Sequence, residues 1–500
     1  MDTGGQSNYQ KYVQEIGEYG TVTQVYYPIA VAQGLPTARP HELVYFENGA
    51  LGEIFNIHPD TVEILLFSKD PVATGTNVAR SGKLFSVPVG FELLGKVINP
   101  LCQSLLPDPN FKIPATERPV DTEPTTVDAR ARLKDSLKTG VSVVDMLIPL
   151  GRGQRELVIG DRKSGKTAFL LATVKNQIEL GALAIYAAVG KKKSDIRQIQ
   201  DYFIREGLME KVIIVATSSS DSPSLIYETP AVAMALAEFF RDEGKDVIVT
   251  MDDLSTHAKF YRELSLIAKN FPGRDSYPGD VFYSHAKLME RAGCFKHPKV
   301  GAVTITCLPV CETVEGDLAG YIQTNIMGMT DGHIFFDSNV YKEGRRPAVN
   351  IPLSVTRVGK QIQTPAERSV NRELLSFLGL YEKTQALSHF GAELTDHVKV
   401  VLKNGEKIYK FFTQPQDMVV PPEVQLITFA MIWNSLIDDT MTIEDVRKKL
   451  IEAVKANPKI SDFFKGLCDV KTFNDLLDGI SKNKEYLQTL CGKTTQSAKS

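Results

Sequence analysis

The chain has 500 residues, of which 43% are hydrophobic and 23% are charged, and its formal net charge is −3. These values are typical of a folded soluble protein with several domains. A slightly acidic chain is a poor candidate for general nucleic-acid binding, which needs a basic surface. No apolar run is long enough to span a bilayer, and the start, MDTGGQSNYQ, lacks the basic and apolar regions of a secretory signal.

The first part of the chain is predicted to be a polar tail followed by a small β domain. Residues 1–19 are polar and favour a short helix. Within residues 20–89, β-branched runs such as 21–25 and 62–65 are separated by Gly, Pro, Asn and Asp, which predicts an antiparallel β-barrel or sandwich. Prolines then recur through residues 100–136, which predicts an extended connector on a surface.

Apolar strands and helices alternate in the middle of the chain. The predicted strands are 156–160, 182–189, 212–216, 247–251 and 303–307. A helix is predicted between two of them, at 230–242. This alternation predicts an α/β domain within residues 90–361, with a parallel sheet covered on both faces. In residues 362–500 the β signals fade, and amphipathic segments such as 366–381 and 426–437 predict a C-terminal helical bundle.

The stretch ELVIGDRKSGKTAFL, residues 156–170, has the pattern of a phosphate-binding loop, G-x-x-x-x-G-K-T, between a strand and a helix. The two glycines let the backbone curl so that its N–H groups and the helix N-terminus face phosphate oxygens. Lys166 is expected to reach the β- and γ-phosphates, and the Thr167 hydroxyl to coordinate Mg²⁺. The predicted nucleotide-binding residues are Gly160, Asp161, Arg162, Lys163, Ser164, Gly165, Lys166, Thr167 and Ala168.

A second nucleotide signal is the strand VIVTMDD, residues 247–253, which ends in two acids. We expect Asp252 to hold a water molecule on Mg²⁺, because this ion keeps most of its waters and takes few protein ligands. The alternative is that a strand-end Asp only caps the next helix. Asp253 is the better candidate for that role, which leaves Asp252 for the metal.

Hydrolysis also needs a carboxylate near the γ-phosphate to orient the attacking water. We expect it after the strand beside the phosphate-loop strand, which the sequence places at 182–189. The residues that follow are Gly190 and the lysines 191–193. A lysine ammonium cannot accept a proton as a glutamate does, so either the base comes from elsewhere or the site binds nucleotide without hydrolysing it. Two of the three lysines are expected to be surface residues.

Many segments match one family in order, among them GTVTQVYYPIAVAQGL, SVPVGFELLGKVINPL, LKTGVSVVDMLIPLGRGQRELVIGDRKSGKT, MDDLSTHAKFYRELSL, FPGRDSYPGDVFYSHAKLMERAG, VEGDLAGYIQTNIMGMTDGHIFF and EGRRPAVNIPLSVTRVG. From about residue 20 to about residue 440 the chain resembles the alpha subunits of the F-type rotary ATP synthases. The GRGQRELVIGDR run distinguishes alpha subunits from beta subunits and from export-type relatives.

The resemblance implies a ring of alternating alpha and beta subunits around a gamma shaft, with a peripheral-stalk subunit of the delta or OSCP type. Alpha sites would hold Mg-ATP (or ADP) without turnover, while beta sites catalyse ATP synthesis and hydrolysis coupled to transport of protons or sodium ions. It also implies a peripheral membrane complex, on the cytoplasmic face of a bacterial plasma membrane or the matrix or stroma side in an organelle. The family usually has Gln where this chain has Lys191, and we hypothesise that the lysine strengthens nucleotide retention.

The resemblance also assigns residues outside the phosphate loop. Arg357, with Thr356 before it, matches the arginine that alpha inserts into the neighbouring beta site, where a forked cation stabilises transition-state charge. The adenine end is implied to contain Tyr341, Arg346, Pro347, Gln414 and Gln416. Gly328 stands where the family tends to have a Ser at that interface.

Two rival functions remain open from sequence. A self-sufficient hexameric ATPase of the export type would need a glutamate at position 191. A Rho-like RNA translocase would need a basic, aromatic surface in residues 20–89, which contain several acids and few Lys or Arg.

Overall fold

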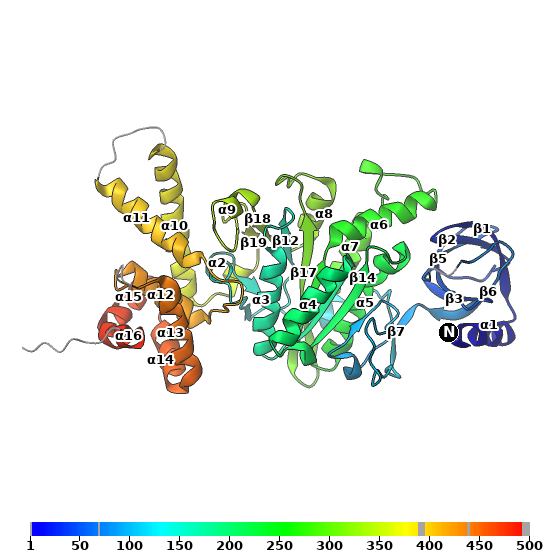
Figure 1. The fold of residues 1–500 in the computed structure, drawn as a ribbon, viewed down its shortest axis with the longest axis horizontal. Coiled ribbons are helices and arrows are strands. Elements are labelled where there is room, and N and C mark those ends of the chain that lie inside the picture. The colour runs from blue at the N-terminus through cyan, green and yellow to red at the C-terminus, as the bar shows by residue number, and fades with distance from the viewer. Residues whose placement is uncertain (1–2, 69–70, 389–395, 438–440, 493–500) are drawn as a thin grey trace, which may run out of the picture.

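The computed structural model describes residues 3–68, 71–388, 396–437 and 441–492. A barrel lies at one end of the molecule, an α/β region with a central sheet in the middle and a helical region at the other end (Figure 1). The outermost residues of the predicted first and last segments, 1–2 and 493–500, lie outside the described residues. Within the described ranges, no helix has both the length and the apolar character needed to cross a membrane.

The N-terminal strands close into a barrel in the order β1-β2-β5-β4-β3-β6. They are β1 (Tyr19–Tyr26), β2 (Ile29–Gln33), β3 (Glu42–Phe46), β4 (Leu51–Ile57), β5 (Val62–Leu66) and β6 (Asn77–Leu84). Alternate residues of β3 are buried, as expected for a strand with one face toward a core. One of them is charged: Glu42 accepts hydrogen bonds from Arg80 Nε and Nη2 at 2.9 and 3.1 Å, which pairs the buried charges.

Helix α1 (Thr3–Ile16) covers strands β3 and β6 of the barrel. Irregular chain then leads to the central sheet and contains the short elements β7 (Ser86–Pro88), η1 (Phe91–Leu93), β8 (Val97–Ile98), β9 (Glu117–Pro119), η2 (Val127–Ala129), β10 (Ser136–Leu137), α2 (Ser142–Leu147) and β11 (Leu150–Gly151). Of these, β8 joins the central sheet at its edge, beside β14.

The central sheet has nine strands, in the order β19-β18-β12-β17-β15-β13-β14-β8, with β16 paired to β17. Its strands after β8 are β12 (Glu156–Gly160), β13 (Leu183–Lys191), β14 (Val212–Ser218), β15 (Val247–Asp252), β16 (Gly293–His297), β17 (Gly301–Glu312), β18 (Gly332–Phe336) and β19 (Val355–Thr356). Only β16 and β19 run antiparallel to their neighbours. The predicted parallel sheet is confirmed, and all five predicted strands are present, most of them slightly longer than predicted.

The helices of this region are α3 (Lys166–Glu179), α4 (Lys193–Arg205), α5 (Pro223–Asp242), α6 (Leu254–Ile267), α7 (Val281–Glu290), α8 (Tyr321–Met329) and α9 (Ser338–Lys342), with the 3-10 turns η3 (Met209–Lys211), η4 (Arg274–Ser276) and η5 (Gly359–Gln361). Neighbouring residues of one strand face two different cores: Ile185 lies in the core that contains α5, and Tyr186 in the core that contains α3 and α4. The sheet is therefore covered on both faces. Helix α5 begins at Pro223, earlier than predicted, and contains Pro230.

One prediction about strand order is wrong. The strand that ends in Lys191, β13, was expected beside the phosphate-loop strand β12, but β17 and β15 lie between them. The reason is that β15 and β17, which follow β13 in the chain, pair in the sheet between β12 and β13. Because these strands are parallel, their carboxyl ends still meet at one edge of the sheet.

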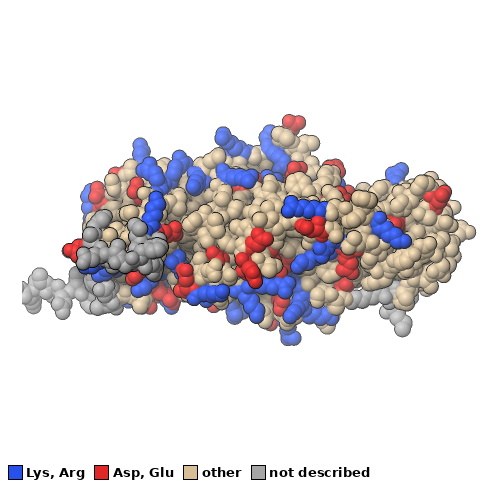
Figure 2. Space-filling model, turned by 90° about the horizontal axis from the view of Figure 1, so that it is seen from above, with Lys and Arg blue, Asp and Glu red and all other residues tan. Residues whose placement is uncertain are grey.

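The C-terminal helices are α10 (Pro365–Ser388), α11 (Asp396–Phe412), α12 (Pro422–Trp433), α13 (Ile443–Ala456), α14 (Pro458–Cys468), α15 (Phe473–Lys482) and α16 (Lys484–Leu490). Helix α12 is at their centre, because all its residues from Val424 to Ile432 are buried. The predicted C-terminal bundle is confirmed. On the face drawn in Figure 2, Lys and Arg side chains are interspersed with Asp and Glu side chains over the middle of the molecule.

Candidate functional site

A cavity of about 820 Å³ opens at the carboxyl edge of the sheet, between the phosphate loop, the ends of β13 and β15, helix α9 and the segment after α11. It brings together most of the predicted site residues: Arg162, Lys163, Ser164, Gly165, Lys166, Thr167, Ala168, Asp252, Tyr341, Arg346, Pro347, Gln414 and Gln416. Gly160 and Asp161 lie at the base of the loop rather than in the cavity wall. Segments more than 200 residues apart therefore contribute to one site.

The phosphate loop follows from local backbone requirements. Gly165 has a φ of 102°, a conformation that L side chains rarely adopt, and it directly precedes helix α3. A Cβ at Gly160 would lie 2.2 Å from the carbonyl oxygen of Phe336 on the neighbouring strand. The Lys166 ammonium donates hydrogen bonds to the carbonyls of Gly160 and Asp161, both at 2.7 Å. Burial lowers the pKa of Lys166, although the nearby acids oppose this shift.

Asp252, at the end of β15, contacts two donors. Tyr186 Oη donates to its Oδ2 at 2.8 Å, and Lys191 Nζ lies 2.6 Å from its Oδ1. Tyr186 is fully buried, and burial together with the adjacent Asp252 charge raises its pKa well above the usual value. Lys191, the last residue of β13, therefore lies among the acidic side chains at the carboxyl ends of the strands.

The next residue, Asp253, is the N-cap of helix α6, where its carboxylate accepts a hydrogen bond from the Thr256 N–H at 2.6 Å. The third acid of this group, Glu312, ends β17 and pairs with Arg162, whose Nε lies 2.9 Å from Oε2.

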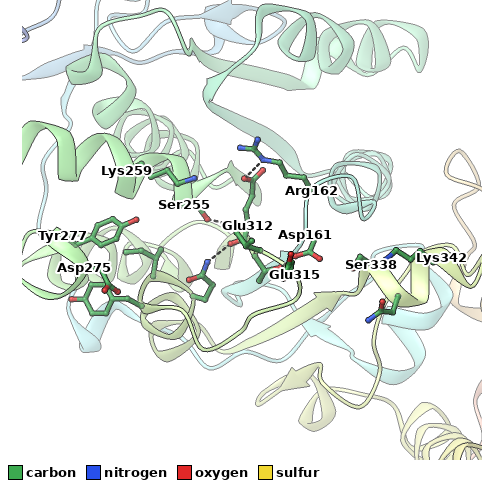
Figure 3. A pocket seen from close by; sticks show the side chains of 16 residues that line it. Asp161, Arg162, Ser255, Lys259, Asp275, Tyr277, Glu312, Glu315, Ser338 and Lys342 are labelled. Atoms are coloured by element: carbon green, nitrogen blue, oxygen red, sulfur yellow. Dashed lines mark hydrogen bonds and ion pairs between the residues drawn. The ribbon is translucent and has the colours of Figure 1, made fainter.

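A second cavity of about 990 Å³ adjoins the first and shares Arg162 and Glu312 with it. In Figure 3 this pair lies between Tyr277 on one side and Lys342 of α9 on the other. Asp161 also lines this cavity and accepts hydrogen bonds from the Thr313 hydroxyl at 2.6 Å and the Gly316 N–H at 2.9 Å. These bonds tie the phosphate loop to the segment between β17 and α8.

The side chains that could hold Mg²⁺ at the cavity fit this ion only in part. Thr167 begins helix α3 with its neighbour Lys166 and is exposed at the cavity, where its hydroxyl could coordinate a metal bound to phosphate. Asp252, the expected holder of a metal-bound water, is already paired with Lys191. Within the described part of the chain, no group of three or more His, Cys, Asp or Glu residues is arranged to hold a metal ion.

The far end of the cavity is built from α9, residues 346–348 and residues 414–416. The Arg346 guanidinium stacks on the Tyr341 ring, 3.3 Å from its centroid. The two planar groups therefore form a stacked pair at this end of the cavity. The side-chain amide of Gln414 is used by the protein: its nitrogen donates to the Gly140 and Met418 carbonyls, and its oxygen accepts from Ser142. Gln416 is exposed at the cavity.

Arg357 does not line this cavity. It follows the edge strand β19 and is exposed, and its guanidinium makes no hydrogen bond or ion pair with any residue that the structure describes. Its N–H donates to the Asp331 carbonyl at 3.0 Å, and the Asp331 carboxylate accepts three hydrogen bonds from Arg155, one from the backbone N–H and two from the guanidinium. The turn that carries the arginine is therefore anchored by backbone contacts, while the arginine side chain is exposed.

Sequence reasoning missed three residues that shape the cavity. Glu312 and Asp195 line it, and Tyr186 binds Asp252 from below. Glu312 had a usable signal, since it ends a buried strand at the carboxyl edge of the sheet. Tyr186 gave none, because a tyrosine within an apolar strand is normally a packing residue.

Comparison with known proteins agrees with this geometry. The family model described as ATP synthase alpha/beta family, nucleotide-binding domain, matches residues 140–356, and the one described as ATP synthase alpha/beta chain, C terminal domain, matches residues 363–482. A protein named ATP synthase subunit alpha from Clostridium acetobutylicum is 38% identical over 465 residues, which are 92% of this chain and 91% of the relative. A protein of the same name from Caldanaerobacter subterraneus subsp. tengcongensis is 38% identical over 446 residues, 88% of this chain and 87% of the relative. The chain therefore belongs to the ATP synthase alpha/beta family, and over most of its length it is similar to alpha subunits of that family.

Proposed function

We propose that this chain is a non-catalytic, nucleotide-binding alpha subunit in the head of an F-type ATP synthase. It binds ATP or ADP in the cavity at the phosphate loop and does not hydrolyse it. The observation that carries this proposal is the Lys191 ammonium within 2.6 Å of Asp252. This cation is at the end of β13, at position 191, where a self-sufficient ATPase of the export type would need a glutamate to orient water.

The proposed contacts within the cavity follow from its lining. Lys166 and the loop N–H groups bind the phosphates, and Thr167 and Asp252, through water, are the residues that would hold Mg²⁺. The stacked pair of Tyr341 and Arg346, with Pro347, receives the base. Gln416 is exposed at the cavity, where its amide can bind a base edge, whereas Gln414 positions this wall through its bonds to Gly140 and Ser142.

Arg357 acts in trans. Its exposed guanidinium, outside the chain's own cavity, supports insertion into the nucleotide site of a neighbouring beta subunit, where it would stabilise charge on the transferring phosphoryl group. Thr356 holds the turn. The partners are beta subunits that alternate with this chain, a central gamma shaft and a peripheral-stalk subunit, so the chain is attached to a membrane only through its complex, which transports protons or sodium ions.

ATP hydrolysis by the purified chain, alone and mixed with a beta subunit, tests this proposal. The lone chain is expected to bind ATP without hydrolysing it, and the mixture to hydrolyse it. Hydrolysis by the lone chain that is lost in Glu312→Gln or Asp195→Asn would identify a base and overturn the non-catalytic role. It would favour the export-type alternative, whereas hydrolysis that requires added RNA would favour the Rho-like one.

A further inference from the structure

The Lys191 ammonium lies inside a group of acids at the nucleotide cavity. It is 2.6 Å from Asp252 Oδ1 and 3.5 Å from Asp253 Oδ2. The Lys191 side chain is 20% exposed, and those of Asp252 and Asp253 are 5% and 3% exposed. In such a poorly hydrated place the attraction between the charges is screened much less than at an open surface.

Other carboxylate oxygens of this group also accept hydrogen bonds. The second oxygen of Asp252 accepts from Tyr186, and Asp253 accepts from the first turn of α6. Glu312 is paired with Arg162. Each of these three acids is therefore bound to a donor of the protein itself, and two of those donors, Lys191 and Arg162, are cations that line the cavity.

From this arrangement we propose that nucleotide binding at this site does not depend on Mg²⁺, because the Lys191 ammonium supplies the positive charge that the metal supplies in other phosphate-loop sites. The inference rests on the proposed function, in that the cavity must bind a nucleotide. Its ligand class is then the metal-free nucleoside di- or triphosphate as well as the Mg²⁺ complex.

The physical reason is competition for one carboxylate. If Mg²⁺ accompanied the nucleotide, Asp252 would be the residue that holds a metal-bound water. Here Asp252 is already paired with Lys191, so a metal-bound water would share this carboxylate with the ammonium, and the two cations would repel each other. Without the metal, the ammonium can stay on Asp252 and face the phosphates as well. Added Mg²⁺ therefore contributes little to affinity.

The residue type at position 191 supports the same conclusion, because a lysine brings a positive charge to this acid group and pairs with two of its members. A glutamine at this position would offer an amide of similar reach with no charge.

The test measures ATP binding to the purified, nucleotide-free full chain by titration calorimetry, in excess Mg²⁺ and in excess EDTA. For the wild type the two dissociation constants are expected to differ by less than about threefold, and for Lys191→Gln EDTA should weaken binding by at least about tenfold. Lys193→Gln, which removes a neighbouring charge outside the cavity, is the matched control and should behave as the wild type.

Each outcome is decisive. Wild-type binding that is present with Mg²⁺ and lost in EDTA overturns this inference and leaves the proposed function standing. Absence of ATP binding in both conditions overturns the proposed function itself. The wild-type comparison needs no variant, so it decides the matter even if Lys191→Gln does not fold. A folded Lys191→Gln that binds equally in both conditions would show that the lysine is not the cause.

Discussion

The Thr356 hydroxyl donates a hydrogen bond to the Pro149 carbonyl, 207 residues earlier in the chain, at 3.0 Å. The same hydroxyl accepts the Gly359 N–H at 3.1 Å. These two bonds close a short turn and fasten it to the segment before the phosphate-loop strand. Arg357 is within that turn, so its position is set by the sheet rather than by its own side-chain contacts.

Replacing Arg357 with Ala should abolish the activity that the chain supports in a beta subunit. We expect the turnover number of the mixture to fall by a factor on the order of 10³ or more, as for other arginines supplied in trans to a phosphoryl-transfer site. Arg357→Lys should recover little, because an ammonium cannot bridge two oxygens as a guanidinium does. Steady-state hydrolysis by the reconstituted mixture measures this. Lys360→Ala, an exposed cation after the same turn, is the control, and full activity of Arg357→Ala would refute the role in trans.

Gly359 should tolerate no side chain. A Cβ there would lie 1.4 Å from the Pro149 carbonyl oxygen, so Gly359→Ala must move the backbone of the turn. We expect a loss of about 2–4 kcal/mol in the free energy of unfolding, in the range of severe packing errors. Gly379→Ala is the matched control, because nothing lies within 4 Å of its Cβ position in helix α10. Alanine there should stabilise by about 0.5–1 kcal/mol, and equal effects of the two variants would contradict the described turn.

Lys166→Ala should weaken ATP binding to the chain while leaving the fold intact. The ammonium is expected to leave the Gly160 and Asp161 carbonyls for phosphate oxygens, and a hydrogen bond to a charged group contributes about 1.5–3 kcal/mol, or roughly 10- to 100-fold in affinity. Calorimetric titration with ATP measures the change. Lys193→Ala should bind ATP as the wild type does. Unchanged affinity in Lys166→Ala would place the phosphates elsewhere.

A pair of buried histidines should make the chain less stable in acid. His257 donates through Nε2 to the Tyr227 carbonyl, so its Nδ1 accepts from His285 Nε2 at 2.9 Å, and both rings are neutral. Burial lowers the pKa of His257 to about 4, and burial together with His257 lowers that of His285. Unfolded histidines titrate near 6.5, so between about pH 6.5 and pH 4 the unfolded chain binds protons that the folded chain does not, and stability falls as pH falls.

The size of that effect is about 1.4 kcal/mol per pH unit for each histidine that stays neutral. His285→Gln keeps an N–H donor for His257 and removes one titrating group. Denaturant unfolding at a series of pH values should therefore show a smaller loss of stability in acid for His285→Gln than for the wild type. Parallel curves for the two proteins would show that His285 titrates normally.

Local patterns were sufficient to predict most helices and strands, but not the order of the strands in the sheet. The strand Glu156–Gly160 and the loop after it could be predicted because apolar content, glycine spacing and the G-K-T signature all lie within one short segment. The barrel and the helical bundle were likewise visible as changes in periodicity. Helix α5 was predicted too short because Pro230 reads as a helix start, whereas the helix begins one proline earlier, at Pro223.

The contacts between strands could not be predicted. The pairing of Lys191 with Asp252 depends on β13 and β15 being neighbours in register, with Ala188 opposite Asp252, and no local pattern encodes that register. The sequence showed only that a cation replaced the expected acid. The use of the Gln414 amide by Gly140 and Ser142 is equally non-local, because these residues are more than 270 positions apart.

That last contact has a mechanical consequence. Gln414 belongs to the segment between helices α11 and α12, and its N–H donates to the Arg346 carbonyl. Its side chain bonds to Gly140, before α2, and to Ser142, the first residue of α2. The wall that is proposed to receive the base thus also connects the helical region to the α/β region. A nucleotide bound there would contact both regions and would stabilise their contact. By thermodynamic linkage, any movement that separates the helices from the α/β region would then also weaken nucleotide binding.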